Sequence, residues 1–416
     1  MTERDSPTSW PSLEVFWPAV SSAAERLGTP LYVYFPAAAK STFERTQSAL
    51  SGWGRGILAY SVKTNPFIGL LHDLRSWGAG AEVVSEWEYD IALRAGFAPR
   101  QLVLNGPLKT REGLTRIVRR PPLTINIDSL DELATLQRVV GGARPPLRVG
   151  VRLCPLPTSG ESRSRFGLEC DTGEVTEAIT RIQATRGLTL ASIHVHVGTQ
   201  VRDMARCIAA VRQARLMWSQ YGLGGNTYLD MGGGFPYDHD RPMECQEFSA
   251  WRFLAALRQA WDLSIVPRLI IEPGRIIAAP CFAVVSRVLS CKPRVGEPSI
   301  VVLDTGTNHN VMGAFYDHLW RFQQAEEDPG EFRFCGSLCM EDDILSGVIS
   351  GVRPQVGSLV GMFNAGAYSL SLARAFIQPR PAIISMMSDG RTRLESRRET
   401  LRGAYGQAKR VVTREA

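Results

Sequence analysis

Eight short apolar runs alternate with helical segments between residues 57 and 271, and this alternation constrains the fold more than any other feature. The runs have the length and composition of buried strands: Ile57–Val62, Ala81–Val84, Leu102–Leu104, Thr124–Ile127, Arg148–Leu153, Ser192–Val197, Thr227–Met231 and Leu269–Ile271. Helical periodicity marks several connections: Glu86–Ala95, Ser129–Val140, Val175–Arg186 and Met204–Tyr221. Eight strands joined by helices within roughly 250 residues predict an α/β fold, a closed parallel (β/α)8 barrel.

The rest of the chain has a different pattern. A helical segment, Leu13–Leu27, is followed by a strand, Leu31–Tyr34. Beyond Arg275, short β-branched runs alternate with turns: Phe282–Val288, Ser299–Leu303, Gly347–Val352 and Leu359–Phe363. These runs predict a C-terminal antiparallel β domain.

The composition is that of an ordinary globular chain, with 44% hydrophobic and 21% charged residues among 416. No apolar run approaches the length of a membrane span, and the first residues lack the pattern of a signal peptide. The eight cysteines are therefore expected as free thiols in a reducing compartment, the cytoplasm. We expect neither a membrane nor a nucleic acid as a partner.

The net charge of +6 is concentrated near the carboxyl terminus, where seven basic residues lie between Arg391 and Arg410. We interpret this stretch as a solvated, partly frayed helical tail. A surface that binds an acidic partner is the less favoured alternative.

Lys63 stands at the carboxyl end of the first predicted barrel strand, where Asn65-Pro66 turns the chain. Catalytic groups gather at this end of barrel strands, and a lysine is costly to bury there. A desolvated lysine can form a Schiff base with a carbonyl, which is how pyridoxal phosphate (PLP) is held. The simpler alternative is a lysine whose ammonium extends into solvent.

His194 and His196 alternate with apolar residues, so both point to the same side of one predicted strand. Two such histidines could bind a metal, but no third ligand stands at a helpful spacing, and we expect no metal. An imidazole that lies flat on an aromatic cofactor is the functional interpretation. A hydrogen-bonded core histidine is the structural alternative.

Three consecutive glycines, Gly232–Gly234, follow another predicted strand, where bare backbone N–H groups could approach a phosphate or simply form a tight turn. Glu272 and Arg275 flank a Pro-Gly bend after the last barrel strand. Glu272 could pair with a pyridinium nitrogen and Arg275 could bind phosphate. A surface ion pair would explain the same two residues.

Six motifs in one order together resemble the ornithine/diaminopimelate decarboxylase family of fold-type III PLP enzymes, over roughly residues 30–380. They are Tyr60–Asn65, His194–Gln200, Gly232–Gly234, Glu272–Arg275, Cys339–Asp343 and Gly366–Tyr368. The resemblance implies a PLP-binding barrel over residues 34–276. It also implies a β domain built from residues 1–33 and 277–416, and a homodimer with shared active sites.

The resemblance also implies individual roles. Lys63 would be the Schiff-base lysine and His196 the residue stacked on the PLP ring. Glu272 would face the pyridine nitrogen, braced by Arg152, and Glu82 would lie near the lysine. The phosphate would be held by Thr199, Gly233, Gly234, Arg275 and Tyr368. After CO2 leaves, Cys339 would return a proton, and the partner subunit would donate the loop of Cys339 and Asp343.

Four positions would then contact the substrate: Tyr316, Met340, Asp343 and His309. Met340 stands where relatives carry Glu or Asp to read a distal ammonium, and Met312 replaces an arginine of the diaminopimelate enzymes. His309 stands where an acidic residue is common. These departures are similar to those of relatives that act on larger or conjugated substrates in siderophore and antibiotic pathways.

Three classes of function remain open. The first is a PLP-dependent decarboxylase of an amino acid or amino-acid conjugate, with diaminopimelate or ornithine/lysine decarboxylase proper as the alternative. The second is a racemase on the same barrel, which the Cys339 motif disfavours. The third is a non-catalytic, decarboxylase-like binding protein, although such relatives lose the lysine, the cysteine or the phosphate-binding residues.

Overall fold

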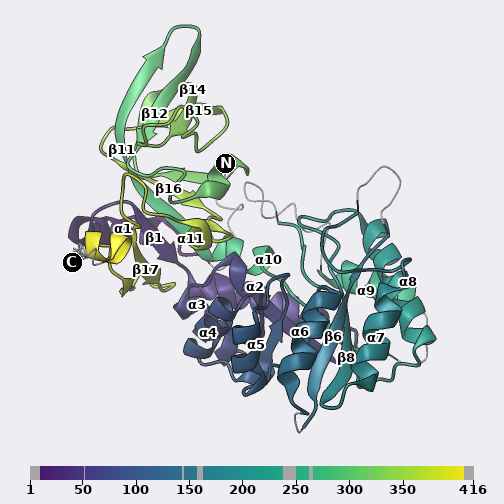
Figure 1. Cartoon of the computed structure of the whole chain (residues 1–416). Coiled ribbons are helices and arrows are strands. Elements are labelled where there is room, and N and C mark those ends of the chain that lie inside the picture. Colours follow the sequence, from purple (N-terminus) through teal and green to yellow (C-terminus); the bar gives the residue numbers. More distant parts are fainter. Residues whose placement is uncertain are drawn as a thin grey trace, which may run out of the picture. The chain divides into compact units, whose positions relative to one another are not determined.

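The computed structural model describes residues 10–50, 52–142, 145–156, 163–237, 250–261, 266–316 and 318–406. The chain divides into two compact units. A barrel unit contains residues 39–238 and 242–278, and a β unit contains residues 1–38, 239–241 and 279–416. Figure 1 labels several elements of each unit.

Eight parallel strands form the barrel: β2 (Gly56–Ser61), β3 (Gly80–Val83), β4 (Leu102–Leu104), β5 (Thr124–Ile127), β6 (Leu147–Cys154), β8 (Leu188–Val195), β9 (Tyr228–Asp230) and β10 (Arg268–Ile271). Each pairs with its neighbours, and pairing of β10 with β2 and of β5 with β6 closes the ring. The short β7 (Leu168–Glu169) pairs with β6 beside the ring. The predicted barrel fold is confirmed.

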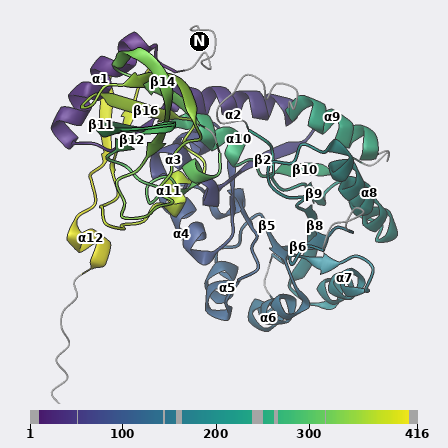
Figure 2. The ribbon, with the colours of Figure 1, turned by 90° about the horizontal axis from the view of Figure 1, so that it is seen from above.

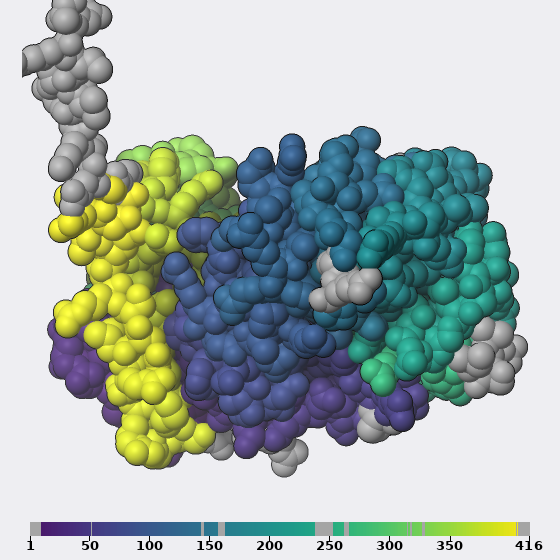
Figure 3. Space-filling model, turned by 60° about the horizontal axis from the view of Figure 1, so that its bottom comes forward, coloured from purple at the N-terminus to yellow at the C-terminus, as the bar shows by residue number. Residues whose placement is uncertain are grey.

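Helices connect the strands: α2 (Pro36–Leu50), α3 (Ile68–Ser76), α4 (Glu86–Arg94), α5 (Arg111–Val118), α6 (Leu130–Val140), α7 (Glu174–Ala184), α8 (Met204–Gln220) and α9 (Ala250–Trp261). Side chains of Ser85, Thr110, Ser129 and Asp203 cap four of them by accepting backbone N–H bonds. Figure 2 shows the helices outside the strands. On the face drawn in Figure 3, the blue to teal residues form a continuous outer surface.

The barrel interior changes character along its axis. Ala59, Val103, Tyr228 and Ile270 pack together as an apolar layer. Beyond it, at the carboxyl ends of the strands, buried polar side chains follow: Ser61, Glu82, Asn105, Asn126, His194 and Asp230. Because buried polar groups are costly without partners, this polar end is where chemistry is expected.

The β unit holds a nine-stranded sheet formed by β1 (Leu31–Tyr34), β11 (Phe282–Arg294), β12 (Glu297–Leu303), β13 (Leu319–Phe322), β14 (Ala325–Cys335), β15 (Ile349–Pro354), β16 (Leu359–Phe363), β17 (Ala382–Met386) and β18 (Thr392–Ser396). Most pairs are antiparallel, as predicted, but β1–β17 and β12–β14 are parallel. The sheet is therefore mixed. Parallel pairing is possible here since the strands of each parallel pair are joined by long connections rather than hairpins.

Helix α1 (Leu13–Leu27) packs against this sheet. Its apolar face, including Phe16 and Val20, joins Leu31 and Val33 of β1 in a buried cluster that also contains Ile384 of β17. Segments near both ends of the chain thus share one hydrophobic core.

The carboxyl-terminal stretch is not the helical tail that we predicted. In the described part of this stretch, residues 392–396 form strand β18, antiparallel to β17, and residues 401–405 form the helix α12 (Leu401–Tyr405). Charged side chains alternate along β18, and Arg393 donates to Glu395 at 2.7 Å. Because side chains alternate along a strand, Arg393 and Glu395 lie on the same face and can pair. Lys409 and Arg410 lie outside the described residues.

Among the described residues, no helix is long and apolar enough to cross a membrane. The seven cysteines in this part of the chain all have free thiols.

Candidate active site

Lys63 lies in a short 3-10 turn, Val62–Thr64, directly after β2. Its Nζ atom is 2.6 Å from Oε2 of Glu82 and 2.7 Å from Oγ of Ser61. The Ser61 hydroxyl donates to the same Glu82 oxygen at 2.6 Å. The Lys63 side chain is 39% exposed and that of Glu82 1%. The lysine therefore pairs with a buried carboxylate at the mouth of the barrel instead of extending freely into solvent.

Glu82 is held in its ionised form. Burial alone would raise its pKa, but the charge of Lys63 and hydrogen bonds from Lys63, Ser61 and Asn105 lower it below the usual value. A stable anion next to the lysine amine follows from this balance.

Glu272 follows β10 and is 4% exposed. Burial raises its pKa well above the usual value, and the charges of Asp230 and Glu82 raise it further. Burial also raises the pKa of Asp230, to about 7. These carboxyl groups therefore favour a proton or a cation between them.

His194 is buried beside these acids, with Nε2 3.8 Å from Oε2 of Glu272. Neither ring nitrogen has a hydrogen-bond partner among the described residues. Ligand atoms of His194, Asp230 and Glu272 lie within 4.8 Å of one another. The group contains His194 but not His196, so it differs from the histidine pair that the sequence suggested. It can accept either a ring N–H or a metal ion.

Two amides that the sequence analysis missed connect the acids. Asn105 Nδ2 donates to Oε1 of Glu272 at 2.6 Å and to Oε1 of Glu82 at 3.2 Å. Asn126 Nδ2 donates to Asn105 Oδ1 at 2.8 Å and to Asp230 Oδ2 at 3.1 Å. Only their positions in the sequence could have indicated them, since Asn105 directly follows one predicted strand and Asn126 lies within the next.

Arg152 does not brace Glu272, contrary to the expectation. Its Nη1 donates to Asp128 Oδ1 at 2.9 Å, and its guanidinium lies over the Phe166 ring at 4.6 Å. Asn105 takes the place beside Glu272 that we had assigned to Arg152.

His196 lies one residue beyond the end of β8. Burial, with a smaller contribution from Lys63, lowers its pKa to about 4, so the ring is neutral at physiological pH. Its Nδ1 accepts the Gly233 N–H at 3.3 Å, which links the imidazole to the glycine loop.

The glycine loop can be formed only by glycine. Gly232 and Gly234 have φ values of +61° and +88°. A Cβ on Gly233 would lie 2.4 Å from the Glu272 carbonyl oxygen, and one on Gly234 would lie 2.3 Å from that of Gly198. The loop thus presents bare backbone, beside exposed Thr199 after β8.

Arg275, which we expected at the phosphate, is buried and begins the short helix α10 (Arg275–Ala278). It lies three residues after Glu272, so one bend positions both side chains.

The remaining predicted site residues belong to the β unit. Cys339 is exposed and Met340 is 38% exposed. Asp343 is buried and accepts bonds from Thr307 N at 2.7 Å and Leu338 N at 2.8 Å. Its carboxylate therefore fixes the loop that carries Cys339.

Three more predicted residues lie elsewhere in this unit. Tyr316, after the turn Val311–Ala314, is half-buried, as is Tyr368, whose φ is +64°. His309 is fully buried, and its ring nitrogens lie 3.2 Å from Thr305 Oγ1 and 3.1 Å from the Pro379 carbonyl oxygen. The structure supports a packing role for His309 rather than substrate contact.

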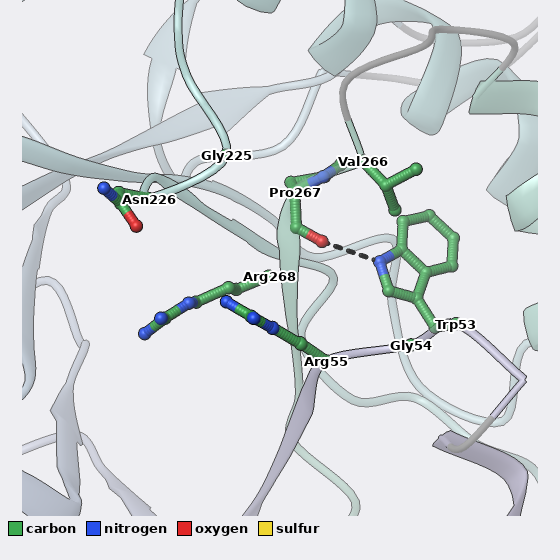
Figure 4. A pocket seen from close by; sticks show the side chains of 8 residues that line it. All are labelled: Trp53, Gly54, Arg55, Gly225, Asn226, Val266, Pro267 and Arg268. Carbon is green, nitrogen blue, oxygen red and sulfur yellow. Dashed lines mark hydrogen bonds between the residues drawn. The ribbon is translucent and has the colours of Figure 1, made fainter.

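A separate cavity of about 440 Å3 opens at the amino-terminal ends of β2 and β10 (Figure 4). Its lining includes Arg55, Arg268 and Trp53, whose indole donates to the Pro267 carbonyl oxygen at 2.9 Å. The described lining residues include no carboxylate, histidine or lysine. The polar cluster at the opposite strand ends is therefore the candidate active site.

This cluster fits PLP. The lysine amine lies at the mouth of the barrel, the glycine loop offers backbone N–H groups for a phosphate, and buried carboxyl groups favour a protonated ring nitrogen. A metal ion would use the histidine and the acids but would leave Lys63 and the glycine loop unexplained.

Comparison with known proteins agrees. The pyridoxal-binding domain of the pyridoxal-dependent decarboxylases matches residues 38–279. Diaminopimelate decarboxylase of Aquifex aeolicus is 27% identical over 402 residues, 93% of each chain. That of Pseudomonas aeruginosa is 28% identical over 405 residues, 93% of this chain and 94% of the relative.

Solved structures share the fold. The crystal structure of diaminopimelate decarboxylase from M. jannaschii matches with a TM-score of 0.85 at 23% identity, covering 93% of this chain and 94% of that one. The family match spans more than half of the chain. The chain therefore belongs to the pyridoxal-dependent decarboxylases, PLP-dependent carboxy-lyases that act on amino acids, as its six motifs predicted.

Proposed function

We propose that this PLP-dependent amino-acid decarboxylase binds its cofactor through Lys63 and pairs the pyridine nitrogen with Glu272. The 2.6 Å ion pair of Lys63 with buried Glu82, at the same strand ends as Glu272, supports this most directly. When bound, PLP supplies the electron sink that accepts the electron pair of the Cα–carboxylate bond as CO2 leaves.

The neighbouring residues then have definable tasks. Glu82 and Ser61 hold the Lys63 amine through oxygen atoms 2.6 and 2.7 Å from its nitrogen. Glu272 keeps a proton on the ring nitrogen. Neutral His196 would pack against the ring.

The phosphate, in this proposal, lies on the glycine loop. Gly234 offers a backbone N–H group, Gly233 allows close approach because it lacks a side chain, and Arg275, Thr199 and Tyr368 add side-chain donors. The Gly233 N–H already points to His196. The ring-stacking residue and the phosphate loop would therefore move together.

The thiol of Cys339 is proposed to return a proton to the substrate carbon. It is exposed in its own subunit, on a loop that buried Asp343 fixes. We propose that the protein is a homodimer in which this loop completes the partner's site. Asp343 would then act by positioning Cys339 and its neighbours rather than by binding substrate.

For the substrate, the first candidate is a diamino acid of the diaminopimelate type, because the relatives with 27–28% identity carry that name. A second candidate is an amino acid whose far end is acylated or conjugated, as in specialised biosynthesis. Met340 and Met312 favour the second candidate, since neither side chain can pair with a distal ammonium or carboxylate.

Release of CO2 tests both candidates. The purified protein, loaded with PLP, is assayed with meso-diaminopimelate, lysine, ornithine and an Nε-acylated lysine, with Lys63→Ala as the inactive control. Release from meso-diaminopimelate at a kcat/KM far above the others supports the first candidate. Preference for the acylated substrate supports the second. No release from any of them, by protein that carries PLP, would contradict the decarboxylase proposal for these substrates.

A further inference from the structure

We propose that Asn105 is a positioning residue that holds the lysine-side carboxylate, Glu82, and the ring-side carboxylate, Glu272, in one hydrogen-bonded unit. The inference rests on the proposed function, which assigns these two acids to Lys63 and to the pyridine nitrogen. Asn105 directly follows β4 and is 3% exposed.

The Asn105 amide lies between the two acids. Its nitrogen is 2.6 Å from Oε1 of Glu272 and 3.2 Å from Oε1 of Glu82. A side-chain NH2 group has two hydrogens, so it can serve both acids at once. The second oxygen of Glu82 faces Lys63, and the second oxygen of Glu272 lies 3.8 Å from His194. The amide therefore occupies the side of each acid that the lysine and the histidine leave open.

The orientation of this amide is determined by a chain of donors. Asn105 Oδ1 accepts from Asn126 Nδ2 at 2.8 Å, and the same nitrogen donates to Asp230 Oδ2 at 3.1 Å. The Ser192 hydroxyl donates to Asn126 Oδ1. A reversed Asn105 would direct its oxygen at two carboxylates, so only one orientation satisfies the network.

Lys109 holds the backbone on both sides of the network. Its buried ammonium donates to the carbonyl oxygens of Gly106 at 2.7 Å and Asn126 at 3.0 Å, and to Glu132 Oε1 at 2.6 Å. The segment after Asn105 and the strand that carries Asn126 are thereby tied together.

A neutral amide suits this position better than a cation would. It donates to two buried acids without adding a positive charge that would compete with Lys63 for Glu82. Loss of the amide would remove the Asn105 donor from both acids, which leaves Glu82 with only Lys63 and Ser61 as donors and favours the protonated forms of both acids. A protonated Glu272 could no longer keep the ring nitrogen protonated, and a protonated Glu82 could no longer hold the lysine.

Two variants test the proposal. Asn105→Leu keeps a similar volume without donors, and Asn105→Asp keeps the shape but places an acceptor against two acids. Asn226→Asp makes the same charge change at an exposed position by the cavity of Figure 4. The readouts are the PLP dissociation constant, the pH midpoint of the visible absorption of lysine-bound PLP, and the pH dependence of unfolding of the PLP-free protein.

We expect both Asn105 variants to bind PLP about tenfold or more weakly, because two charged acceptors each lose a donor. The spectral midpoint should shift by a measurable amount in both, and Asn226→Asp should leave it in place. Affinity and midpoint unchanged within twofold in both variants would overturn the inference.

The failure of the inference and the failure of the proposed function are distinguishable. Wild-type protein without lysine-bound absorption would reject the cofactor assignment, and the PLP-free unfolding profiles would then decide the inference. Profiles with the wild-type pH dependence in both variants would overturn it. If Asn105→Leu fails to fold, Asn105→Ser replaces it, because its single hydroxyl hydrogen can serve only one acid and should give an intermediate loss.

Discussion

Lys63 and Glu82 form an ion pair of 2.6 Å across the carboxyl ends of two adjacent parallel strands, β2 and β3. The acid is almost fully buried, whereas the lysine is partly exposed. The anion is therefore fixed in the interior while the amine faces the opening. A lysine that exchanges one covalent partner for another requires this combination of a fixed counter-ion and an accessible amine.

Lys63→Ala should abolish the visible absorption of bound PLP, because no other amine is proposed to hold the cofactor. Borohydride reduction of the wild-type protein, followed by peptide mass spectrometry, should place the label on Lys63. Lys40→Ala, at an exposed lysine of α2, serves as the control and should retain the absorption. A label on any other lysine would refute the cofactor placement.

Glu82→Gln should slow PLP incorporation about tenfold to a hundredfold, since a hydrogen bond to a charged group contributes roughly 1.5–3 kcal/mol. The rate is followed by the growth of visible absorption after PLP is added to cofactor-free protein. Glu112→Gln, an exposed change of the same kind on α5, should have no effect. Equal rates for the wild type and Glu82→Gln would argue against this pairing.

Glu272→Gln should stabilise the PLP-free protein at neutral and alkaline pH while weakening PLP binding. Burial raises the folded-state pKa of Glu272, so its favourable contribution is complete below the unfolded pKa of about 4.3 and is lost as pH rises through the folded value. Glutamine suffers no such loss.

The free energy of unfolding of Glu272→Gln relative to the wild type should therefore grow between pH 5 and pH 8. It should grow by about 1.4 kcal/mol for each pH unit in that range that lies below the folded-state pKa of Glu272. Urea unfolding at each pH measures it. A constant difference between the two proteins across that range would show that Glu272 does not titrate there.

Mixing inactive Lys63→Ala with inactive Cys339→Ala should restore activity if subunits share sites. Random assortment of a symmetric dimer gives about a quarter of wild-type activity, because half of the dimers carry one intact site. Exchange of subunits is verified with two differently tagged chains. Verified exchange without recovery would mean that each chain builds its own site.

Met340→Glu should raise kcat/KM for a diamino acid relative to an acylated substrate. Leaving a buried ammonium without a partner costs roughly several kcal/mol, on the order of a thousandfold in catalytic efficiency. Met340→Gln, of similar length but uncharged, is the control and should shift the ratio less. Efficient turnover of meso-diaminopimelate by unmodified protein would instead assign the reading of its distal amine to another residue.

Most of the correct predictions came from regular patterns of apolar and polar residues along the sequence. The apolar runs of the barrel appear as strands, and the Lys63, His196 and glycine motifs lie at or just beyond their carboxyl ends. The Ser192 strand ends at Val195, so His196 lies beyond it. Such residues are recognisable because a polar group after an apolar run is unusual in itself.

Interactions between distant segments were not predictable from such patterns. Asn105 gains its position from Glu82, Glu272 and Asn126, which come from three other strands or strand ends. Arg152 pairs with Asp128 rather than with Glu272, because an arginine pairs with whichever carboxylate the fold brings near. Strand β18 was not predicted because charged residues are frequent in this part of the chain, and such a composition suits a helix as well as a strand edge.

The pairing of β1 has a consequence for how the chain is synthesised. Both neighbours of this strand, β11 and β17, belong to the last third of the sequence, whereas the barrel strands pair among themselves. On the ribosome, the barrel can therefore close while both edges of β1 are still unpaired. Until β17 emerges, Leu31–Tyr34 is an apolar segment open to pairing with other nascent chains, and a chaperone that shields it would serve the protein at that stage.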